Sequence, residues 1–214
     1  MADKLPDYDI AIMGLGPAGA TLARLLSQNF RVIALDKKRA DAGSGFKKPC
    51  GGLLSRDAQK ALARFDLTLP KDVLVDPQIF AVKTIDLRSR LVRHYQRFYI
   101  NLDRDKFDRW LTGMIPDRVK ILADCRCTSV KRTGRGFLIR YDEAGMEGCL
   151  TAKYVVGADG ANSLLRRSLY PNSRIRHYIS IQQWFKETHS SPFYSCIFDP
   201  DTSDCCSWSI SKDN

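Results

Sequence analysis

The sequence predicts an α/β fold built on a central parallel sheet, and three observations indicate this fold class. Residues 10–13 form a short, apolar and partly β-branched run, which is typical of a parallel strand covered on both faces. A glycine-containing turn and a helix-like segment separate this run from a second apolar run at residues 32–35. Later segments alternate apolar and polar residues, so we also expect an inserted antiparallel β-meander and the start of a second, β-rich domain.

The glycine turn has the spacing of a Rossmann-like dinucleotide-binding unit. Gly14 allows a tight turn, Gly16 allows a pyrophosphate to approach the backbone, and Gly19 allows the helix to pack closely on the strand. The first amides of the helix would face the phosphates. Asp36 ends the second strand, where a carboxylate accepts hydrogen bonds from ribose hydroxyls and repels a 2′-phosphate. The motif therefore predicts FAD or NAD in preference to NADP, against the alternative of a glycine turn without a ligand.

Capping residues mark the starts of further helices. Ser55 and Asp103 are predicted N-caps, because their side chains can accept hydrogen bonds from the first free amides of a helix. A third, short helix begins at Ser163. The helix after Asp103 carries an apolar stripe with helical spacing, formed by Phe107, Trp110, Leu111 and Met114.

Strand-like segments fall into two groups. Residues 81–87 and 91–100 alternate around a hairpin turn, and the sequence is strand-like again from Ile179 to the end of the chain. The other group supplies the meander and the return to the central sheet, with predicted strands at residues 119–122, 128–132, 136–141, 148–152 and 153–160.

Composition indicates a soluble globular protein of one large or two small domains, with 214 residues, 44% of them hydrophobic and 27% charged. No apolar run approaches the length of a membrane span, and the polar N-terminus lacks the apolar core of a signal peptide. We therefore expect a cytoplasmic protein.

Cysteine spacing argues against a disulfide-rich or zinc-binding protein, and the charge distribution argues against a nucleic-acid-binding protein. The seven cysteines fit neither a disulfide framework nor a zinc site, so we expect reduced structural thiols and no metal. The net charge of +10 is spread along the chain without a nucleic-acid motif. Basic groups such as Lys37 and its neighbours would instead attract an anionic cofactor or a phosphorylated substrate, with a solvated basic face as the default for Arg88, Arg90 and Arg93.

Four motifs occur in a fixed order along nearly the whole chain. They are the turn Gly14 to Gly19 with Asp36, the loop from Lys48 to Gly52, the helix start from Asp103 to Leu111, and the segment from Gly157 to Arg166. This ordered set resembles the geranylgeranyl reductase family of FAD-dependent oxidoreductases. That family belongs to the larger group that contains para-hydroxybenzoate hydroxylase and other flavin monooxygenases.

The resemblance implies a role for each matched residue. The glycine turn would hold the FAD pyrophosphate, Asp36 the adenosine ribose, and Arg104 the phosphate and ribityl region through charge-assisted contacts. An ion pair of Arg104 with Asp103 or Asp108 is the alternative. The residues expected to bind the cofactor are Gly14, Gly16, Pro17, Ala18, Gly19, Asp36, Lys37, Cys50, Gly51, Gly52, Arg104, Asp159 and Gly160.

Cys50 is the candidate catalytic residue. In reductases of the family, the matching Pro-Cys-Gly-Gly loop lies beside the isoalloxazine ring, and Gly51 and Gly52 would let the backbone approach it. The thiol could modulate the flavin or donate a proton to a reduced alkene. The alternative is a small buried residue that fills space against the ring, and both interpretations remain open.

The same pattern divides the chain into two parts. We expect a discontinuous FAD-binding domain at residues 1–78 and 100–172, and part of a substrate-domain sheet at residues 79–99 and 173–214. The later glycine-aspartate motif of the family is missing, so we expect the chain to be an N-terminal portion of a longer enzyme.

The function implied by the resemblance is reduction of a carbon–carbon double bond of a hydrophobic, isoprenoid-like substrate by an FAD-dependent oxidoreductase. NADH or NADPH is one candidate electron donor. A flavin monooxygenase that hydroxylates a small substrate and a non-catalytic nucleotide-binding module are the alternatives. We expect a small hydrophobic substrate and no nucleic acid; peripheral membrane contact through the substrate and the oligomeric state stay open.

Overall fold

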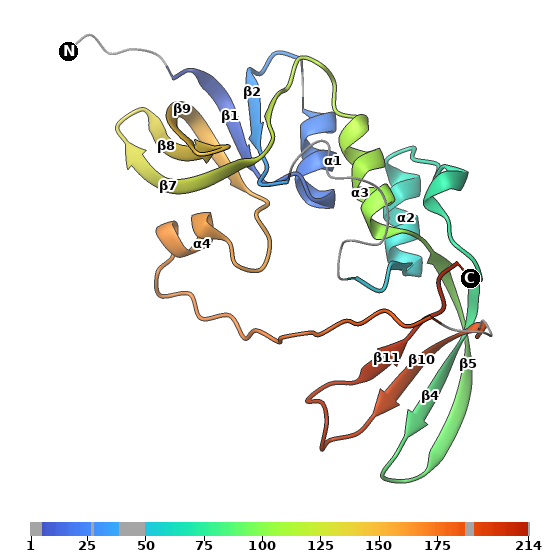
Figure 1. Cartoon of the computed structure of the whole chain (residues 1–214). Helices are drawn as coiled ribbons and strands as arrows, with labels where there is room; N and C mark the ends of the chain where they lie inside the picture. Colours follow the sequence, from blue (N-terminus) through green and yellow to red (C-terminus); the bar gives the residue numbers. More distant parts are fainter. Residues whose placement is uncertain (1–5, 27, 39–49, 187–190, 214) are drawn as a thin grey trace. The chain divides into compact units, whose positions relative to one another are not determined.

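The computed structural model describes residues 6–26, 28–38, 50–186 and 191–213 (Figure 1). The chain forms two compact units, one from residues 1–43 and 108–179 and the other from residues 44–107 and 180–214. Lys48 and Pro49, in the predicted loop from Lys48 to Gly52, lie outside the described residues.

A six-stranded mixed sheet forms the first unit, in the order β6-β2-β1-β9-β8-β7. Strand β1 is central and pairs in parallel with both neighbours, with Ile10 beside Val32 on β2 and beside Tyr154 on β9. The apolar runs at residues 10–13 and 32–35 are fully buried, which confirms the predicted parallel core. The strands are β1 (Tyr8–Met13), β2 (Val32–Leu35), β6 (Lys120–Leu122), β7 (Cys125–Thr133), β8 (Gly136–Glu143) and β9 (Met146–Gly157).

Strand β9 joins the meander to the parallel core. We expected two strands here, at residues 148–152 and 153–160, but the structure has one, which ends at Gly157. Its first half pairs antiparallel with β8, from Met146 beside Glu143 to Ala152 beside Phe137. Its second half pairs in parallel with β1 up to Gly157. A single long strand can serve both partners because they lie on its two opposite edges and are offset along its length.

Among the described residues, two helices belong wholly to the first unit. Helix α1 (Pro17–Leu25) follows the glycine turn and buries Gly19, Ala20 and Ala23. Helix α4 (Leu164–Leu169) is capped by Ser163, whose side chain accepts a hydrogen bond from the Arg166 amide at 3.0 Å. The main core cluster comprises Ala11, Met13, Ile33, Leu35, Leu122, Cys125, Val130, Ile139, Leu150, Ala152 and Leu165.

The predicted caps of the other helices are confirmed. Ser55 accepts from the Ala58 amide at 3.4 Å and starts α2 (Arg56–Arg64). Asp103 accepts from the amides of Asp105 and Lys106 at 2.8 and 3.1 Å and starts α3 (Arg104–Gly113). A short 3₁₀ turn, η1 (Lys71–Val73), precedes the second sheet.

The second unit contains a five-stranded sheet in the order β11-β10-β4-β5-β3. The hairpin of β4 (Ile79–Asp86) and β5 (Leu91–Asn101) forms as predicted. Strands β10 (Phe193–Phe198) and β11 (Ser207–Ser209) extend it on the β4 side. The expected strand from Ile179 is wrong in its first part, because residues 179–186 have no regular structure. Among the described residues after them, Phe193 is the first that joins the sheet.

The boundaries between the two units fall at other positions than the predicted domain boundaries. Residues 44–78 and 100–107 group with the second sheet, whereas residues 173–179 group with the first unit. One physical reason is a short strand that the sequence analysis missed. Strand β3 (Leu53–Leu54) pairs antiparallel with the end of β5, with Leu53 beside Asn101.

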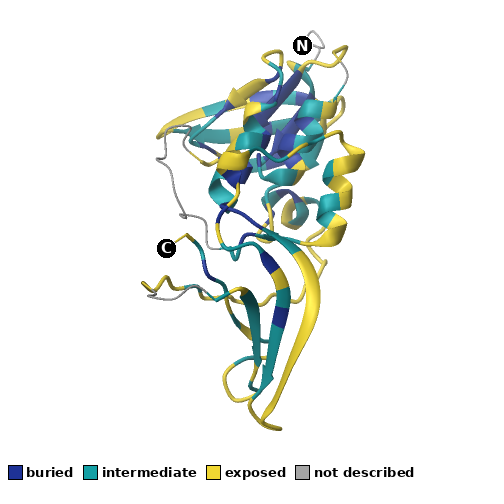
Figure 2. Ribbon diagram, turned by 90° about the vertical axis from the view of Figure 1, so that its right-hand side faces the viewer, coloured by how far each residue is buried: buried dark blue, intermediate teal, exposed yellow. Residues whose placement is uncertain are grey.

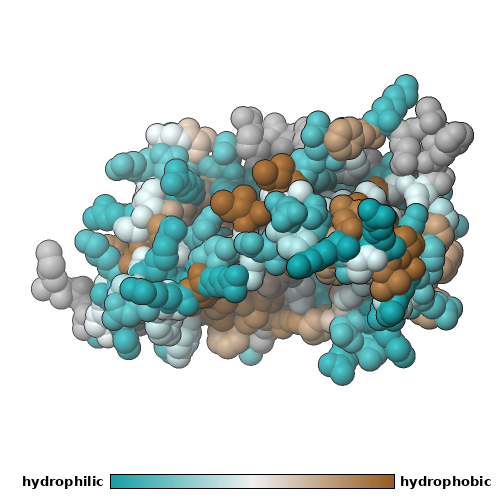
Figure 3. Space-filling model, turned by 90° about the horizontal axis from the view of Figure 1, so that it is seen from below, coloured by the Kyte–Doolittle hydropathy of each residue, from teal (hydrophilic) through white to brown (hydrophobic). Residues whose placement is uncertain are grey.

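Exposure is unequal along the second sheet. Strand β5 is exposed from Leu91 to Phe98, and Figure 2 shows its long yellow course. Exposed large apolar residues of this hairpin include Phe80 and Phe98, at 63% and 58%. Seen from below, apolar side chains are interspersed with hydrophilic ones (Figure 3). Among the described residues, no helix is long and apolar enough to cross a membrane.

Candidate functional site

Close backbone packing holds the glycine turn of the first unit. A Cβ atom on Gly19 would collide with the carbonyl oxygen of Gly14, and one on Gly14 would collide with the carbonyl of Ala158. The Gly14 amide donates to Leu35 O at 2.7 Å, and the Ala158 amide donates to Met13 O at 2.8 Å. The turn is therefore fixed between the carboxyl ends of three parallel strands, β1, β2 and β9.

Gly16 differs from these two glycines. Among the described residues, no atom lies within 4 Å of a Cβ built on it, and its backbone is in an ordinary extended conformation, with φ −67° and ψ −176°. The protein itself therefore gives no steric reason for glycine at this position. Gly16 is also the N-cap of α1, where the first amides have no intrahelical acceptor. Open space at a helix start suits a phosphate group.

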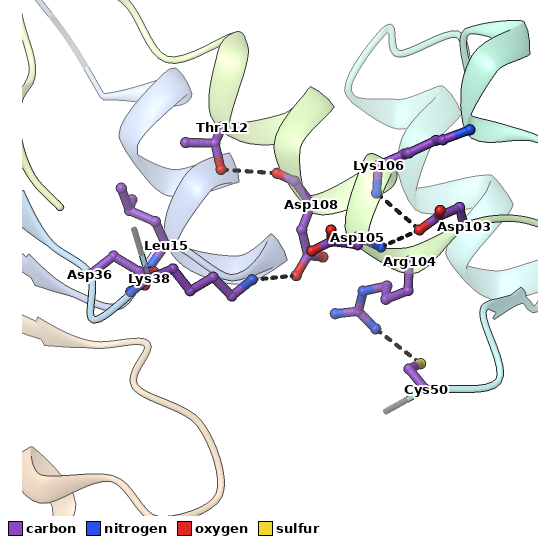
Figure 4. A network of polar contacts seen from close by, with 10 residues as sticks. All are labelled: Leu15, Asp36, Lys38, Cys50, Asp103, Arg104, Asp105, Lys106, Asp108 and Thr112. Carbon is purple, nitrogen blue, oxygen red and sulfur yellow. Dashed lines mark hydrogen bonds and ion pairs between the residues drawn. The ribbon is translucent and has the colours of Figure 1, made fainter. Parts of the chain in front are cut away.

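Asp36, at the end of β2, is hydrogen-bonded to the glycine turn. Its side chain is buried, Oδ2 accepts a short hydrogen bond from the Leu15 amide, and Oδ1 accepts from the Lys38 amide at 2.8 Å (Figure 4). The carboxylate thus holds the middle of the glycine turn against the second strand. The lone pairs that remain are available to ligand hydroxyls, and the ribose contact of Asp36 stays a prediction.

The basic residues after Asp36 have different environments. Lys37 is exposed. Lys38 pairs with Asp108 of α3, with Nζ and Oδ2 3.0 Å apart, and the Asp108 side chain is only 3% exposed (Figure 4). The ion pair joins the end of β2 to the helix. The sequence analysis missed it, since it considered Arg104 as the partner of Asp108.

Asp159 and Gly160 follow the carboxyl end of β9. Oδ2 of Asp159 accepts from the Leu164 amide at 2.7 Å, at the start of α4. Among the described residues, its Oδ1 is buried and has no hydrogen-bond partner. A buried carboxylate oxygen without a donor is costly, so this atom suits a donor that the protein alone does not supply. Gly160 has φ +81°, which by itself favours glycine.

Cys50 lies in the second unit beside the start of α3. Its Sγ is 3.5 Å from Nη1 of Arg104 (Figure 4). The same sulfur is 3.5 Å from the Gly52 amide. Both groups donate to the sulfur. The structure thus brings two predicted site residues, Cys50 and Arg104, into contact.

Packing within the second unit explains Gly51 and Gly52. A Cβ on Gly51 would meet the side chains of Ile210 and Trp208, and one on Gly52 would collide with the carbonyl of Leu102. The Leu102 amide donates to Gly52 O at 2.9 Å. We name Cys50–Gly52 the cysteine turn. Its glycines are required for contact with the strand end and with the C-terminal segment, in addition to any role toward a cofactor.

Lys212 is the residue near this turn that sequence reasoning missed. Its Nζ donates to Leu102 O at 2.8 Å, to Gly52 O at 3.3 Å and, at short range, to Oδ1 of Asn101. Burial lowers the pKa of Lys212 to about 8, against an opposing effect of the negative charges around it. The only sequence signal was its position after Trp208, 160 residues from Gly52.

Two thiols of the first unit, those of the buried Cys125 and the half-buried Cys127, have surroundings that disfavour the thiolate form. Burial raises the pKa of Cys125 to about 12 and that of Cys127 to about 11, so both stay protonated at neutral pH. Nearby negative charges, Glu143 for Cys125 and Asp159 for Cys127, act in the same direction. Across the described ranges, no group of histidine, cysteine and acidic residues could hold a metal ion.

The predicted site residues therefore form two groups. Nine belong to the first unit, around the ends of β1, β2 and β9: Gly14, Gly16, Pro17, Ala18, Gly19, Asp36, Lys37, Asp159 and Gly160. Four belong to the second unit, around the cysteine turn and the start of α3: Cys50, Gly51, Gly52 and Arg104.

Known proteins share this fold. A crystal structure of a geranylgeranyl bacteriochlorophyll reductase-like protein from Thermoplasma acidophilum matches with a TM-score of 0.74 over 98% of this chain and 54% of that chain, at 16% identity. Aklavinone-11 hydroxylase, solved with FAD and aklavinone, matches with a TM-score of 0.60 over 78% of this chain and 35% of that chain, at 20% identity. The fold is that of FAD-dependent oxidoreductases.

One curated relative is a protein whose name describes no activity. Protein CbrA of Shigella sonnei is 53% identical over 206 residues, which cover 96% of this chain and 58% of CbrA. The chain thus spans little more than half the length of this curated relative. No protein-family model matches the sequence.

Proposed function

We propose that this chain belongs to an FAD-dependent oxidoreductase and that its first unit binds the adenosine and diphosphate part of FAD. One observation carries the proposal: Gly16, at the start of α1, faces open space between two glycines that are fixed by packing. The orphan Oδ1 of Asp159 supports it, because a ligand hydroxyl or amide would satisfy this atom. The residues present fit FAD, so each can be given a role.

The chain's own residues would bind and orient the cofactor. The free amides at the start of α1 would donate to the diphosphate, and the remaining lone pairs of Asp36 would accept ribose hydroxyls. Arg104, in contact with Cys50, would supply a positive charge to the cofactor's phosphate and ribityl region. Bound FAD would supply hydride or electron transfer, while the protein contributes binding, orientation and exclusion of water.

We infer a reductase as the first choice of reaction. The reductase-like structure from Thermoplasma matches 98% of this chain, whereas the hydroxylase matches 78%. Cys50 is held by Arg104 and the Gly52 amide, which suits a residue with a fixed role beside the cofactor. The proposed substrate is a hydrophobic, isoprenoid-like alkene, and the proposed electron donor is NADH or NADPH.

A flavin monooxygenase is the second candidate, favoured by the fold shared with aklavinone-11 hydroxylase. Anaerobic assays separate the two, because alkene reduction proceeds without oxygen and hydroxylation does not. Replacing Cys50 with serine tests its role in either enzyme, since unchanged turnover would reject it as a proton donor. A cytoplasmic location and contact with a membrane through the substrate are further proposals, which cell fractionation would test.

The decisive experiment is FAD binding by the Gly16→Ala variant. The added methyl group meets no protein atom but occupies the space expected for the diphosphate, so we expect unchanged thermal stability and at least about a tenfold weaker FAD affinity, or about 1.4 kcal/mol. Gly134→Ala is the matched control, because Gly134 also faces open space but lies in the β7–β8 turn. Equal FAD affinity of Gly16→Ala and native protein would reject the diphosphate site.

A further inference from the structure

Lys212 reaches the cysteine turn from the C-terminal segment of the second unit. Its ammonium group has three N–H bonds and three acceptors: Oδ1 of Asn101, the carbonyl of Leu102 and the carbonyl of Gly52. The side chain thus contacts Asn101 at the end of β5, Leu102 just before α3, and the cysteine turn. A lysine with three protein acceptors has little freedom, so its position is fixed by the structure.

The backbone around Lys212 is fixed on both sides. Asn101 is fully buried and donates to the carbonyl of Ser211 at 3.0 Å. On the other side, the Asp213 amide donates to Asp76 O at 2.8 Å, and Oδ1 of Asp213 accepts from the Asp76 amide at 2.7 Å. The lysine is therefore held in place independently of the turn that it contacts.

Proton counting shows which contact depends on charge. A neutral amine has only two N–H bonds, so loss of one proton leaves one of the three acceptors without a donor. Gly52 O is the farthest acceptor, at 3.3 Å, and already accepts from the Leu102 amide at 2.9 Å. Deprotonation of Lys212 would therefore remove this contact first and leave Gly52 O with the Leu102 amide as its donor.

Burial and the neighbouring groups have opposite effects on the pKa of Lys212. Burial disfavours the ammonium form and is the largest effect on its pKa. Cys50, Asp103 and Asp213 oppose it. Arg104, on α3, adds a second cation that contacts Cys50.

We propose that Lys212 is the positioning residue of the cysteine turn, and that its ammonium proton holds Gly52, and with it Cys50, in place. This turn is the part of the second unit that would border the flavin, so the consequence for catalysis rests on the proposed function. The positional claim does not, because all the contacts lie within the second unit of the protein alone.

The test is alkylation of Cys50 by iodoacetamide as a function of pH, quantified for each cysteine by mass spectrometry. Exposed Cys149 is the internal reference. Relative to Cys149, Cys50 in the native protein should become more reactive by about threefold or more, as expected for loss of one weak hydrogen bond. The midpoint of this change should lie near the Lys212 pKa of about 8.

Three variants isolate the effect from the titration of the thiol itself. Lys212→Met has no donors and Lys212→Gln has two N–H bonds that do not titrate, so both should show the high-pH reactivity ratio at every pH. Lys71→Met removes an exposed lysine of the same unit and should match the native protein. A native curve that parallels that of Lys212→Gln, or that has no inflection, would overturn the proposal even if Lys212→Met fails to fold.

A spectroscopic arm separates this proposal from the proposed function. If FAD binds, its visible absorption band should shift with pH in the native protein and stay constant in Lys212→Gln. If no variant and no native preparation binds FAD, the proposed function fails, while the alkylation curves still decide the role of Lys212.

Discussion

Replacing Gly19 with alanine tests whether the glycine turn is packed as closely as the structure shows. The new Cβ would collide with the carbonyl oxygen of Gly14 and lie about 3.2 Å from the Cβ of Ala158. The nearest atoms belong to the backbone of a turn that is hydrogen-bonded to Leu35. They cannot move without displacing α1 from β1.

The magnitude follows from two opposing effects. Overpacking of a rigid site costs typically about 1–3 kcal/mol, and a clash with backbone belongs at the upper end of that range. Alanine in place of glycine inside a helix gains about 1 kcal/mol. We therefore expect a net loss of about 2 kcal/mol, which lowers the unfolding temperature of a chain of this size by about 4–8 °C.

Differential scanning calorimetry of Gly19→Ala against Gly113→Ala measures this difference. Gly113 ends α3 and has open space around it, so alanine there brings no clash and should leave stability equal or slightly higher. Gly19→Ala protein that unfolds at or above the native temperature would refute the close approach of α1 to the turn.

Three further predictions concern charged groups. Asp36→Asn leaves one side-chain oxygen for the amides of Leu15 and Lys38, so chemical denaturation should show a loss of about 1–3 kcal/mol. A double-mutant cycle of Lys38→Met and Asp108→Asn should give a coupling energy of about 1 kcal/mol, because one partner is buried and the other is half exposed. The pKa of Lys212 is lowered to about 8 in the folded protein, so the unfolded chain binds more protons above that pH. The stability of native protein relative to Lys212→Met should therefore rise with pH from about 8 toward the ordinary lysine value of 10.5, and a flat difference in urea midpoints would contradict this.

Local chemistry made part of this fold predictable. The side chains of Ser55 and Asp103 accept from amides within three residues, so the sequence near each cap contains the whole interaction. The same holds for the β4–β5 hairpin, in which Asp86 accepts from the amides of Arg88 and Ser89 in the turn itself. Short-range signals of this kind do not depend on the rest of the chain.

Distant contacts limited the remaining predictions. Residues 179–186 have the composition of a strand, yet strand formation also requires a partner segment. In this part of the chain the described pairing with β4 starts at Phe193. The pair Lys38–Asp108 and the contact of Lys212 with Gly52 span 70 and 160 residues. Nothing in the neighbouring residues indicates either partner, so only the folded structure shows that the cysteine turn has a lysine beside it.

The glycines of the first turn show how packing and ligand binding can be separated in one motif. Gly14 and Gly19 are explained by the backbone atoms that they contact, and they would be needed in this fold with or without a cofactor. Gly16 lies between them, has ordinary dihedral angles and contacts nothing in the described structure within 4 Å of its missing Cβ. Open space alone is weak evidence, because Gly134 in a hairpin turn has it as well. At Gly16 the open space coincides with the first amides of a helix of nine residues, next to a strand end that carries a buried carboxylate. The diphosphate that we propose for this site would account for all three features together.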